Sequence, residues 1–352
     1  MPDDFNLSCP LPLDHHDTIQ MAHGGGGRIM QRLIEGMFVP AFAGDGPAET
    51  IPLHDSAVLE ADGTRLAMTT DTFVVNPLFF PGGDIGKLAV CGTVNDLAMA
   101  GADPKWLSTG FILEEGFPLE SLERVVQSMQ KTAAAAGVRI VTGDTKVVDR
   151  GKGDGLFINT AGVGIVPSGI EISPQRVRPG DAILVSGDLG RHGIAIMSVR
   201  EGLEFEGALE SDCDCLGHLV VAMRQVAGDL HCLRDLTRGG LAAALNEIAT
   251  SAQVGIELEE SAVPVAPQVA GACEILGLDP LYVANEGRLV AFVAAEAADT
   301  VLRLMQQHPA APQPVVIGRV TETHPGCVEL HGGLGGSRIL DLLSGEQMPR
   351  IC

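Results

Sequence analysis

The sequence predicts a two-domain protein in which both domains mix strands and helices. The chain has 352 residues, which is more than one ordinary hydrophobic core covers. Short apolar runs of strand length alternate with longer amphipathic runs in both halves. Between the halves, residues 167–179 contain three prolines and little periodicity. We therefore expect two α/β halves of similar size that meet in this segment.

In the first half, a polar lead over residues 1–22 and a glycine run precede a helix expected at 29–38, and residues 40–50 are expected to form a loop. A long apolar helix is expected from Asp84, its candidate N-cap, to residue 100. A strongly amphipathic helix is expected over 119–136, stopped by Gly137. Strands are expected at 56–59, 66–70, 105–113, 138–142 and 156–166, with a Gly-Asp-rich loop between the last two.

In the second half, strands are expected at 182–185, 254–258, 288–293 and 315–321. Helices are expected after the turn at 186–190 as far as residue 199, and at 219–226, 240–251 and 297–307. The expected organisation is a flexible lead over 1–50, a first domain over 51–170, a second over 171–335, and a mobile tail over 336–352 that ends in Cys352.

The composition limits the partners and the compartment. A formal charge of −22 repels nucleic acid and anionic membrane, so an anionic ligand such as a nucleotide needs a local cation, above all a metal ion. Eight cysteines in a chain of this length do not form a disulfide scaffold. The first residues show no signal peptide, and no apolar run has transmembrane length. We expect a cytoplasmic protein with reduced thiols.

Several aspartates follow expected strands or lie on expected helices beside small residues, and these are Asp55, Asp71, Asp96, Asp144 and Asp235. Carboxylates from distant segments can hold magnesium ions over a triphosphate, because Mg²⁺ prefers hard oxygen ligands. For each one singly, a turn or capping aspartate is the alternative. Asp96 differs from the others because it lies on an apolar helical pattern, where a charge without a partner is costly.

The last residue, Cys352, offers a soft nucleophile on a terminal segment. Such a thiol can be loaded in one place and carried to another, and a chance terminal cysteine is the alternative. The α-carboxylate beside the thiol disfavours the thiolate by like-charge repulsion. A working Cys352 therefore needs a hydrogen-bond donor or a cation in a pocket.

Other candidate groups are weaker when taken alone. The glycine run Gly24, Gly25, Gly26 and Gly27 lacks the Lys-Ser/Thr pair of a Walker A loop, but its amides could surround phosphate; a plain linker is the alternative. Lys146 could donate to a developing oxyanion and Glu286 could take a proton, although surface residues of these types are common. Cys213, Cys215 and His218 have a spacing that is atypical of structural zinc.

Taken together, several sequence motifs resemble those of one family, and they extend over nearly the whole chain. They are His-Gly-Gly-Gly-Gly, Thr-Asp-Thr-Phe-Val-Val-Asn-Pro, Ile-Gly-Lys-Leu-Ala-Val-Cys-Gly-Thr-Val-Asn-Asp-Leu, Thr-Gly-Asp-Thr-Lys, Asp-Leu-Thr-Arg-Gly-Gly and the final Pro-Arg-Ile-Cys. The family is that of the hydrogenase maturation factor HypE, a carbamoyl dehydratase. It belongs to the superfamily of aminoimidazole ribonucleotide synthetase and selenophosphate synthetase.

The resemblance implies an N-terminal domain whose strands form a barrel with those of a second copy, and a C-terminal α/β domain. It also implies ATP and Mg²⁺ as cofactors. The implied magnesium ligands are Asp55, Asp71, Asp96 and Asp235; the implied nucleotide-binding residues are Gly24 to Gly27 and Asp144; and the implied catalytic residues are Cys352, Lys146 and Glu286.

The implied reaction starts when a partner carbamoyltransferase loads a carboxamide onto Cys352. ATP then activates the amide oxygen, and loss of phosphate leaves an S-cyanate that serves as the cyanide source for a nickel–iron hydrogenase. The implied partners are that carbamoyltransferase, an iron-carrying maturation scaffold and a second copy of the chain. Two alternatives stay open, namely another enzyme of the superfamily such as selenophosphate synthetase, and a non-catalytic scaffold that presents Cys352. The reaction of selenophosphate synthetase is expected to need a cysteine or selenocysteine in the glycine-rich segment. This chain has neither residue in that segment.

Overall fold

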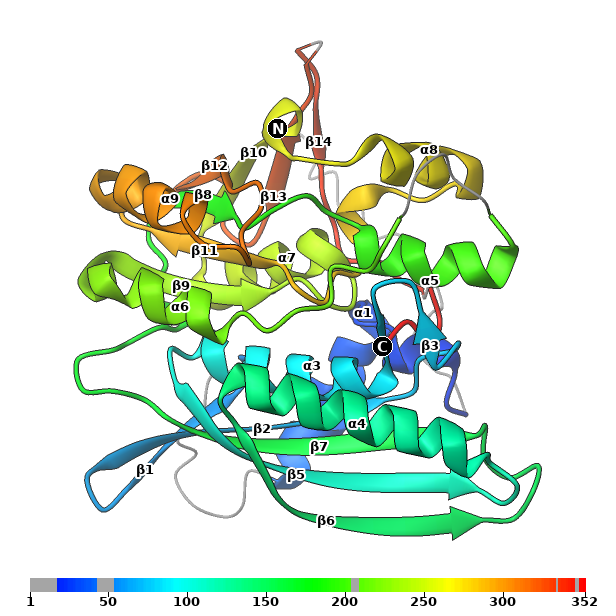
Figure 1. The fold of residues 1–352 in the computed structure, drawn as a ribbon. Helices are drawn as coiled ribbons and strands as arrows, with labels where there is room; N and C mark the ends of the chain where they lie inside the picture. Colours follow the sequence, from blue (N-terminus) through cyan, green and yellow to red (C-terminus); the bar gives the residue numbers. More distant parts are fainter. Residues whose placement is uncertain (1–17, 43–53, 204–208, 334, 346–347) are drawn as a thin grey trace.

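The computed structural model describes residues 18–42, 54–203, 209–333, 335–345 and 348–352, and it consists of two α/β domains stacked on one another (Figure 1). The N-terminal domain is drawn below and the C-terminal domain above, and the chain ends between them. Within the described residues, no helix is both long enough and apolar enough to cross a membrane. The expected two-domain, mixed α/β architecture is confirmed.

The N-terminal domain is a five-stranded sheet covered on one face by two helices. Its elements are β1 (Ala57–Ala61), β2 (Thr64–Phe73), β3 (Phe79–Phe80), β4 (Gly83–Asp84), α3 (Ile85–Met99), β5 (Asp103–Glu114), α4 (Leu119–Ala136), β6 (Arg139–Val148) and β7 (Leu156–Ile165). The sheet order is β1-β2-β7-β5-β6, and only the β5–β6 pair is parallel. Strands β3 and β4 form a small separate ribbon.

Burial alternates along β7 and shows which face of this sheet the helices cover. Leu156, Ile158 and Thr160 are buried, and the Thr160 hydroxyl contacts Thr93 of α3 at 2.5 Å. The residues between them, such as Asn159, are half-buried or exposed. Because strand side chains point alternately to opposite faces, the second face of the sheet is uncovered in the single chain.

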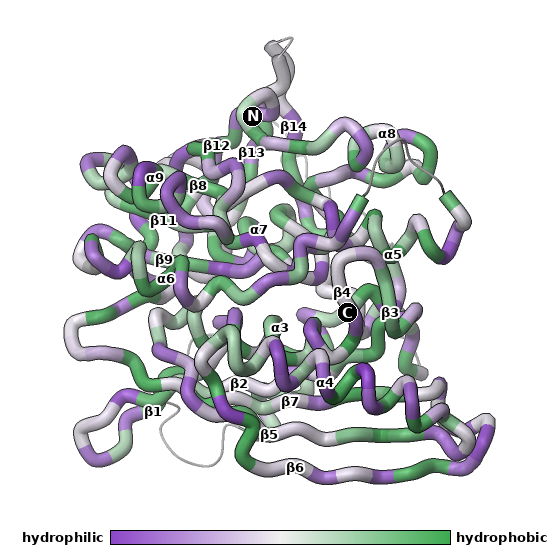
Figure 2. Tube along the Cα trace, in the orientation of Figure 1, coloured by the Kyte–Doolittle hydropathy of each residue, from purple (hydrophilic) through white to green (hydrophobic). Residues whose placement is uncertain are grey.

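Local sequence sets the limits of α3 and α4. The Asp84 carboxylate accepts hydrogen bonds from the backbone N–H groups of residues 86 and 87, so it caps α3 as predicted. Helix α4 alternates hydrophilic and hydrophobic positions along its length (Figure 2) and buries Val125 and Met129 against the domain. Gly137 ends it with φ 70°, a left-handed conformation that suits glycine.

The C-terminal domain is built on a seven-stranded sheet of order β14-β13-β10-β12-β8-β11-β9. Its strands are β8 (Ala182–Val185), β9 (Leu230–Asp235), β10 (Gly255–Glu259), β11 (Leu289–Val293), β12 (Val315–Thr321), β13 (Val328–His331) and β14 (Ser337–Ile339). Its α-helices are α5 (Arg191–Glu201), α6 (Gly217–Met223), α7 (Gly240–Ala252), α8 (Pro267–Leu276) and α9 (Ala298–Gln306). Its 3₁₀ turns are η3 (Pro174–Arg176), η4 (Arg224–Asp229), η5 (Glu260–Ala262), η6 (Pro280–Tyr282) and η7 (Ala295–Ala297).

The described part of the N-terminal lead packs beside the tail. It contains η1 (Met21–Gly24), α1 (Arg28–Leu33), the π-helical turn η2 (Ile34–Phe38) and α2 (Val39–Phe42). The Arg28 N–H donates to the Leu343 carbonyl at 2.9 Å, and the Arg28 guanidinium pairs with Asp341 at 2.6 Å. Two segments more than 300 positions apart in the sequence therefore meet at the junction of the domains.

Several predicted elements differ from the structure. The Gly-Asp-rich loop expected after residue 142 is wrong, because β6 continues to Val148 in parallel pairing with β5. Strands β9, β13 and β14 had not been predicted. β9 is a short edge strand of this sheet that is nonetheless almost entirely buried, and its sequence mixes His231, Arg234 and Asp235 with apolar residues, so its pattern shows no clear period.

Candidate active site

Three of the predicted metal-ligating aspartates meet where the two domains face one another. Asp55 precedes β1, Asp96 lies in the last turn of α3, and Asp235 ends β9 of the other domain. One carboxylate oxygen from each of them lies within 4.8 Å of the others. The fold therefore brings together three acids that are separated by up to 180 positions in the chain.

The protonation of these three carboxyl groups is governed mainly by their burial, which nearby positive groups offset only in part. Desolvation raises the pKa of Asp55 to about 6 against the opposing attraction of Arg234. Burial raises the pKa of Asp96 well above its usual range, and the nearby carboxylates of Asp235, Asp71 and Asp55 raise it further. Burial likewise raises the pKa of Asp235, with the Asp55 carboxylate as the next cause. Without a cation, the cluster retains protons.

The remaining contacts of the acids leave room for a hard cation. Arg234 pairs with Asp55 at 2.7 Å, and the Thr69 hydroxyl donates to Asp96 at 2.8 Å. The second oxygens of Asp55 and Asp235 are buried and have no hydrogen-bond partner. Oxygen ligands without soft sulfur fit Mg²⁺, and unpartnered buried carboxylate oxygens are costly unless an ion contacts them.

Asp71, the fourth predicted metal ligand, lies on β2 on the face that α3 covers. It stands outside the 4.8 Å group but contributes to the raised pKa of both Asp96 and Asp235. Burial raises the pKa of Asp71 itself, and Arg238 opposes that rise. Asp71 therefore interacts electrostatically with both the acid cluster and Arg238.

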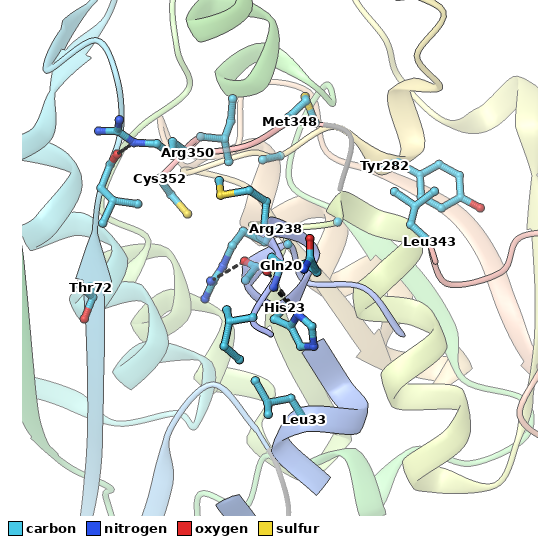
Figure 3. Close-up of a pocket in the computed structure, with 18 residues that line it drawn as sticks. Gln20, His23, Leu33, Thr72, Arg238, Tyr282, Leu343, Met348, Arg350 and Cys352 are labelled. Atoms are coloured by element: carbon cyan, nitrogen blue, oxygen red, sulfur yellow. Dashed lines mark hydrogen bonds between the residues drawn. The ribbon is translucent and has the colours of Figure 1, made fainter. Parts of the chain in front are cut away.

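The end of the chain lines a cavity of about 370 Å³ (Figure 3). Asp71 and Asp235 are close enough to raise the pKa of the Cys352 thiol. The Val74 N–H donates to an oxygen of the Cys352 α-carboxylate at 3.0 Å, and the Asn76 N–H donates to the Arg350 carbonyl at 3.3 Å. The tail therefore lies alongside the segment that follows β2 and is joined to it by these two backbone hydrogen bonds. Backbone bonds of this kind hold the tail irrespective of its side chains.

Two side chains of α5 hold the docked tail. The His192 Nε2–H donates to the Ile351 carbonyl at 2.7 Å, and its Nδ1 accepts from the Ser211 hydroxyl at 2.8 Å. Burial lowers the pKa of His192, which keeps the ring neutral. Arg200 donates to the Pro349 carbonyl at 2.5 Å and also to the carbonyl of Arg350.

The thiol of Cys352 shares its cavity with Arg238 (Figure 3). Burial raises the pKa of this thiol above its ordinary value, and the Arg238 guanidinium opposes that rise. The pKa of Arg238 is itself raised, with Cys352 as the largest cause and Asp71 and Glu286 as further causes. Arg238 is thus a cation of the kind that a working terminal thiol needs.

Glu286 occupies a buried turn before β11 and is 3% exposed. Desolvation raises its pKa well above the usual range, with Cys213 and Asp235 as the next causes. Its Oε1 has no hydrogen-bond partner, while its backbone N–H donates to Asp212 at 3.2 Å. A buried carboxylate of this kind is a strong base once it is ionised.

The four glycines divide between two neighbouring cavities. Gly24 and Gly25 line the Cys352 cavity, whereas Gly26 and Gly27 line a second cavity of about 390 Å³. The Gly24 carbonyl accepts from Arg238 at 3.1 Å. At Gly26, φ is 75° and a Cβ atom would come within 2.8 Å of the Arg238 side chain. This close approach, rather than linker flexibility, requires glycine there.

Lys146 and Asp144 are not brought to Cys352 within one chain. They form an exposed pair on β6 with a Nζ–Oδ2 distance of 2.6 Å. Asp144 is in register with Gly110 of β5 and, through it, with Asn159 of β7, so both lie on the uncovered face of the sheet. Glu286 and the acid cluster lie on the opposite side, which α3 covers.

The cysteines and histidines do not assemble a zinc site among the described residues, where the three aspartates are the only group with metal-site spacing. His231 pairs with Asp181 at 2.8 Å inside the C-terminal domain. Cys91 and Cys273 are buried on α3 and α8, respectively.

Three residues of the site had not been singled out from the sequence, namely Arg238, His192 and Arg200. Arg238 is part of the motif Asp-Leu-Thr-Arg-Gly-Gly. Because a working Cys352 needs a nearby cation, the arginine of this motif could have been considered as that cation. His192 and Arg200 act on backbone carbonyls across the domain junction. Such contacts leave no local pattern in the sequence.

Comparison with known families covers both domains. Residues 53–166 match the family of AIR synthase related proteins, N-terminal domain, and residues 178–330 match the corresponding C-terminal domain. Residues 167–177 lie between these two ranges.

Individual relatives match the chain over most of its length. It is 53% identical over 336 residues to carbamoyl dehydratase HypE of Rhodobacter capsulatus, with 96% of this chain and 98% of the relative covered. It is 52% identical over 338 residues to carbamoyl dehydratase HypE of Escherichia coli, with 96% and 100% covered.

Solved structures of similar proteins extend the comparison. A structure of HypE in complex with ATP is 48% identical with a TM-score of 0.80, and 95% of this chain and 100% of that chain are covered. The matching chain of a HypE–HypF complex is 44% identical with a TM-score of 0.83, and 88% and 99% are covered.

Proposed function

The chain belongs to the family of carbamoyl dehydratase HypE, and from this premise we propose that it converts a carboxamide on the Cys352 sulfur into an S-cyanate in a reaction driven by ATP. The product supplies the cyanide ligand of a nickel–iron hydrogenase. The observation that carries the proposal is the docked tail, because the Cys352 thiol shares a cavity with Arg238 beside the buried acids and Glu286. ATP as the second substrate is supported by the similar HypE that was solved with ATP.

In the proposed reaction, the amide oxygen of the thiocarboxamide attacks the γ-phosphorus of ATP and ADP leaves. The C–O bond then breaks, phosphate departs, and the amide nitrogen loses its two protons to leave a C≡N triple bond. Glu286 is the base that we assign to the nitrogen protons, because it is buried, unpartnered at Oε1 and close enough to Cys352 to affect the pKa of that thiol. Phosphate is a far better leaving group than the amide oxygen, which is why ATP is needed.

We assign Asp55, Asp96 and Asp235 to Mg²⁺, with Asp71 beside them. When bound, the ion supplies charge neutralisation for the phosphates. The unpartnered oxygens and raised pKa values of the acids support this assignment, since a bound cation would offset the cost of desolvating the carboxylates and would relieve their mutual repulsion. The amides of Gly24 to Gly27 are the proposed cradle for the phosphates.

We further propose that the chain works as a homodimer. The uncovered face of the N-terminal sheet exposes Met68, Trp106 and Ile112 to 49%, 43% and 46%. Val163 of β7 lies in register between Met68 and Trp106, so these side chains form an apolar row across the sheet. A second copy covering this face would close a barrel and would also enclose Lys146 and Asp144. We therefore assign Lys146 and Asp144 to a nucleotide-facing role that requires the dimer.

A carbamoyltransferase partner is proposed because the tail must be loaded before it can react. The matching HypE–HypF complex supports a partner of this kind. Loading requires Cys352 to leave the cavity, so the bonds from His192, Arg200 and Val74 must break and form again in each cycle. An iron-carrying maturation scaffold is the proposed acceptor of the cyanide. The use of ATP and of a reduced thiol supports the cytoplasm as the compartment.

Phosphate release tests this function. Protein that carries a carboxamide on Cys352 should release about one phosphate per loaded chain when it receives ATP and Mg²⁺. Cys352→Ala, incubated with the same carbamoyl donor, should still bind ATP but should release no donor-dependent phosphate. Glu286→Gln should load normally and release phosphate slowly. Donor-dependent phosphate release by Cys352→Ala would show that Cys352 does not carry the substrate.

A further inference from the structure

A pair of thiols joins helix α3 to the segment that contacts the Glu286 backbone, and it takes no part in the chemistry described above. Cys91 is fully buried on α3, and Cys215 is half-buried in the segment that precedes α6. Their sulfurs are 3.1 Å apart. A disulfide bond is about 2.05 Å long, so a movement of roughly 1 Å would join them. A third thiol, that of Cys213, also interacts with Cys91 but is 2% exposed.

This arrangement favours sulfur–sulfur chemistry over metal binding. Among the residues that the structure describes, no metal-site group includes a cysteine. Two of the thiols are closed to solvent, whereas Cys215 lines two surface cavities of about 290 and 360 Å³. A small oxidant can therefore reach Cys215, and Cys91 is positioned to react with the oxidised sulfur.

The segment that bears Cys215 holds Glu286 in place. Asp212 accepts hydrogen bonds from the backbone N–H groups of Glu286 and Gly287 at 3.2 and 3.0 Å. The Asp214 N–H donates to the Glu286 carbonyl at 3.3 Å. Asn95, one turn after Cys91 on α3, donates to the Asp214 carbonyl at 3.0 Å. A change in the distance between α3 and this segment is thus transmitted to Glu286.

The same segment also reaches the docked tail. The Cys213 N–H donates to the Ser211 hydroxyl oxygen at 3.0 Å, and that hydroxyl donates to His192, which holds the Ile351 carbonyl. One segment of five residues therefore supports both the assigned base and the carrier thiol.

We propose that Cys91 and Cys215 form a reversible disulfide on oxidation by a hydroperoxide, and that this bond slows the dehydration step by displacing the segment that holds Glu286. The Cys215 sulfur attacks an oxygen of the hydroperoxide and the O–O bond breaks. Cys215 becomes a sulfenic acid, and water (from hydrogen peroxide) or an alcohol (from an organic hydroperoxide) is released. The Cys91 sulfur then attacks the Cys215 sulfur, and the departing hydroxide takes the Cys91 proton to form water. Two thiols are oxidised and one peroxide is reduced. Disulfides that form transiently in the cytosol commonly have sensing roles.

The effect on the dehydration rate rests on the proposed function. The test therefore measures disulfide formation and the dehydration rate separately. Cys352 is first loaded with carboxamide, which protects its sulfur, and the protein is then treated with hydrogen peroxide. Peptide mapping without reductant should find the peptides of Cys91 and Cys215 joined. On addition of ATP and Mg²⁺, the loss of water from the loaded tail should be slower by about tenfold or more, since a 1 Å misplacement can cost about 100-fold.

Two variants serve as controls. Cys215→Ser should show no linked peptides and should keep its dehydration rate after peroxide. Cys327→Ser removes another half-buried cysteine, distant in the sequence, and should behave as the wild type does. Linkage of Cys91 to Cys213, oxidation of Cys215 to a sulfinic acid without linkage, or linkage without loss of rate would each overturn the proposal. Untreated protein that never loses water would refute the proposed function, while the linked peptides would still report on the bond.

Discussion

Replacing Asp96 by Asn tests whether the buried acids are a metal site or a structural network. The change removes one negative charge from three carboxylates whose oxygens lie within 4.8 Å of one another. Two unit charges at that distance repel by about 3 kcal/mol at an effective dielectric constant of about 20. Asn can still accept the hydrogen bond from Thr69, which spans 2.8 Å to the Asp96 carboxylate in the wild type.

Proton uptake relieves part of this repulsion in the metal-free wild type, because burial and the neighbouring acids raise the pKa of Asp96. We therefore expect metal-free Asp96→Asn to gain only about 1 kcal/mol, or roughly 2–4 °C in Tm. Magnesium should reverse the order. Wild type at 100 times its Kd gains about 2.7 kcal/mol, whereas the variant should gain little and should fail to hydrolyse ATP.

Differential scanning calorimetry at pH 8, with and without Mg²⁺, measures both effects in each protein. Asp149→Asn is a matched control, because Asp149 is an exposed aspartate of the same domain and should leave both Tm values unchanged. If metal-free Asp96→Asn melted several degrees below wild type and kept the full magnesium increment, Asp96 would be a structural residue. The acid cluster would then not be the site of the ion.

Three further expectations concern the tail, the pH dependence and the dimer. Arg200→Ala should make Cys352 react about tenfold or more faster with a thiol reagent, because hydrogen bonds to the Pro349 and Arg350 carbonyls are lost, and Arg319→Ala is the control. If Arg200→Ala reacted at the wild-type rate, Arg200 would not hold the tail in the cavity. Burial raises the pKa of Asp55 to about 6, whereas the pKa of an aspartate in the unfolded chain is about 4. Protonated Asp55 therefore stabilises the metal-free fold fully below about pH 4, and this stabilisation is lost as the pH rises through about 6. The increase in Tm caused by Mg²⁺ should grow between about pH 4 and about pH 6, and a constant increase in calorimetry would contradict this. Met68→Lys should shift the protein towards monomer in light scattering, and an unchanged mass would exclude this face as the interface.

Sequence reasoning succeeded where short-range patterns set the structure. The amphipathic run and Gly137 define α4, and Asp84 is followed by the two amides that it caps. The same reasoning missed β9, because a short buried strand that mixes charged and apolar residues has no visible period. It also placed Asp144 and Lys146 in a loop, since it could not show that parallel pairing with β5 extends β6 through them.

The candidate site was predicted as residue types rather than as a geometry. Asp96 stood out because a charge on an apolar helix requires a partner, and its partners proved to be Asp55 and Asp235. The requirement for a cation near Cys352 was evident, but its identity as Arg238 depends on how the two domains meet. No local pattern distinguishes Arg238 from other arginines, because long-range packing determines which of them lies beside the tail.

Mass spectrometry of the tail peptide is the most direct test of the proposed chemistry. Wild-type protein is incubated with a carbamoyl donor and its carbamoyltransferase, and ATP and Mg²⁺ are then added. The peptide that contains Cys352 should first gain the mass of a carboxamide and then lose the mass of one water, on Cys352 and on no other cysteine. A carboxamide that persists after ATP is hydrolysed would mean that this chain only carries the group and that another protein dehydrates it.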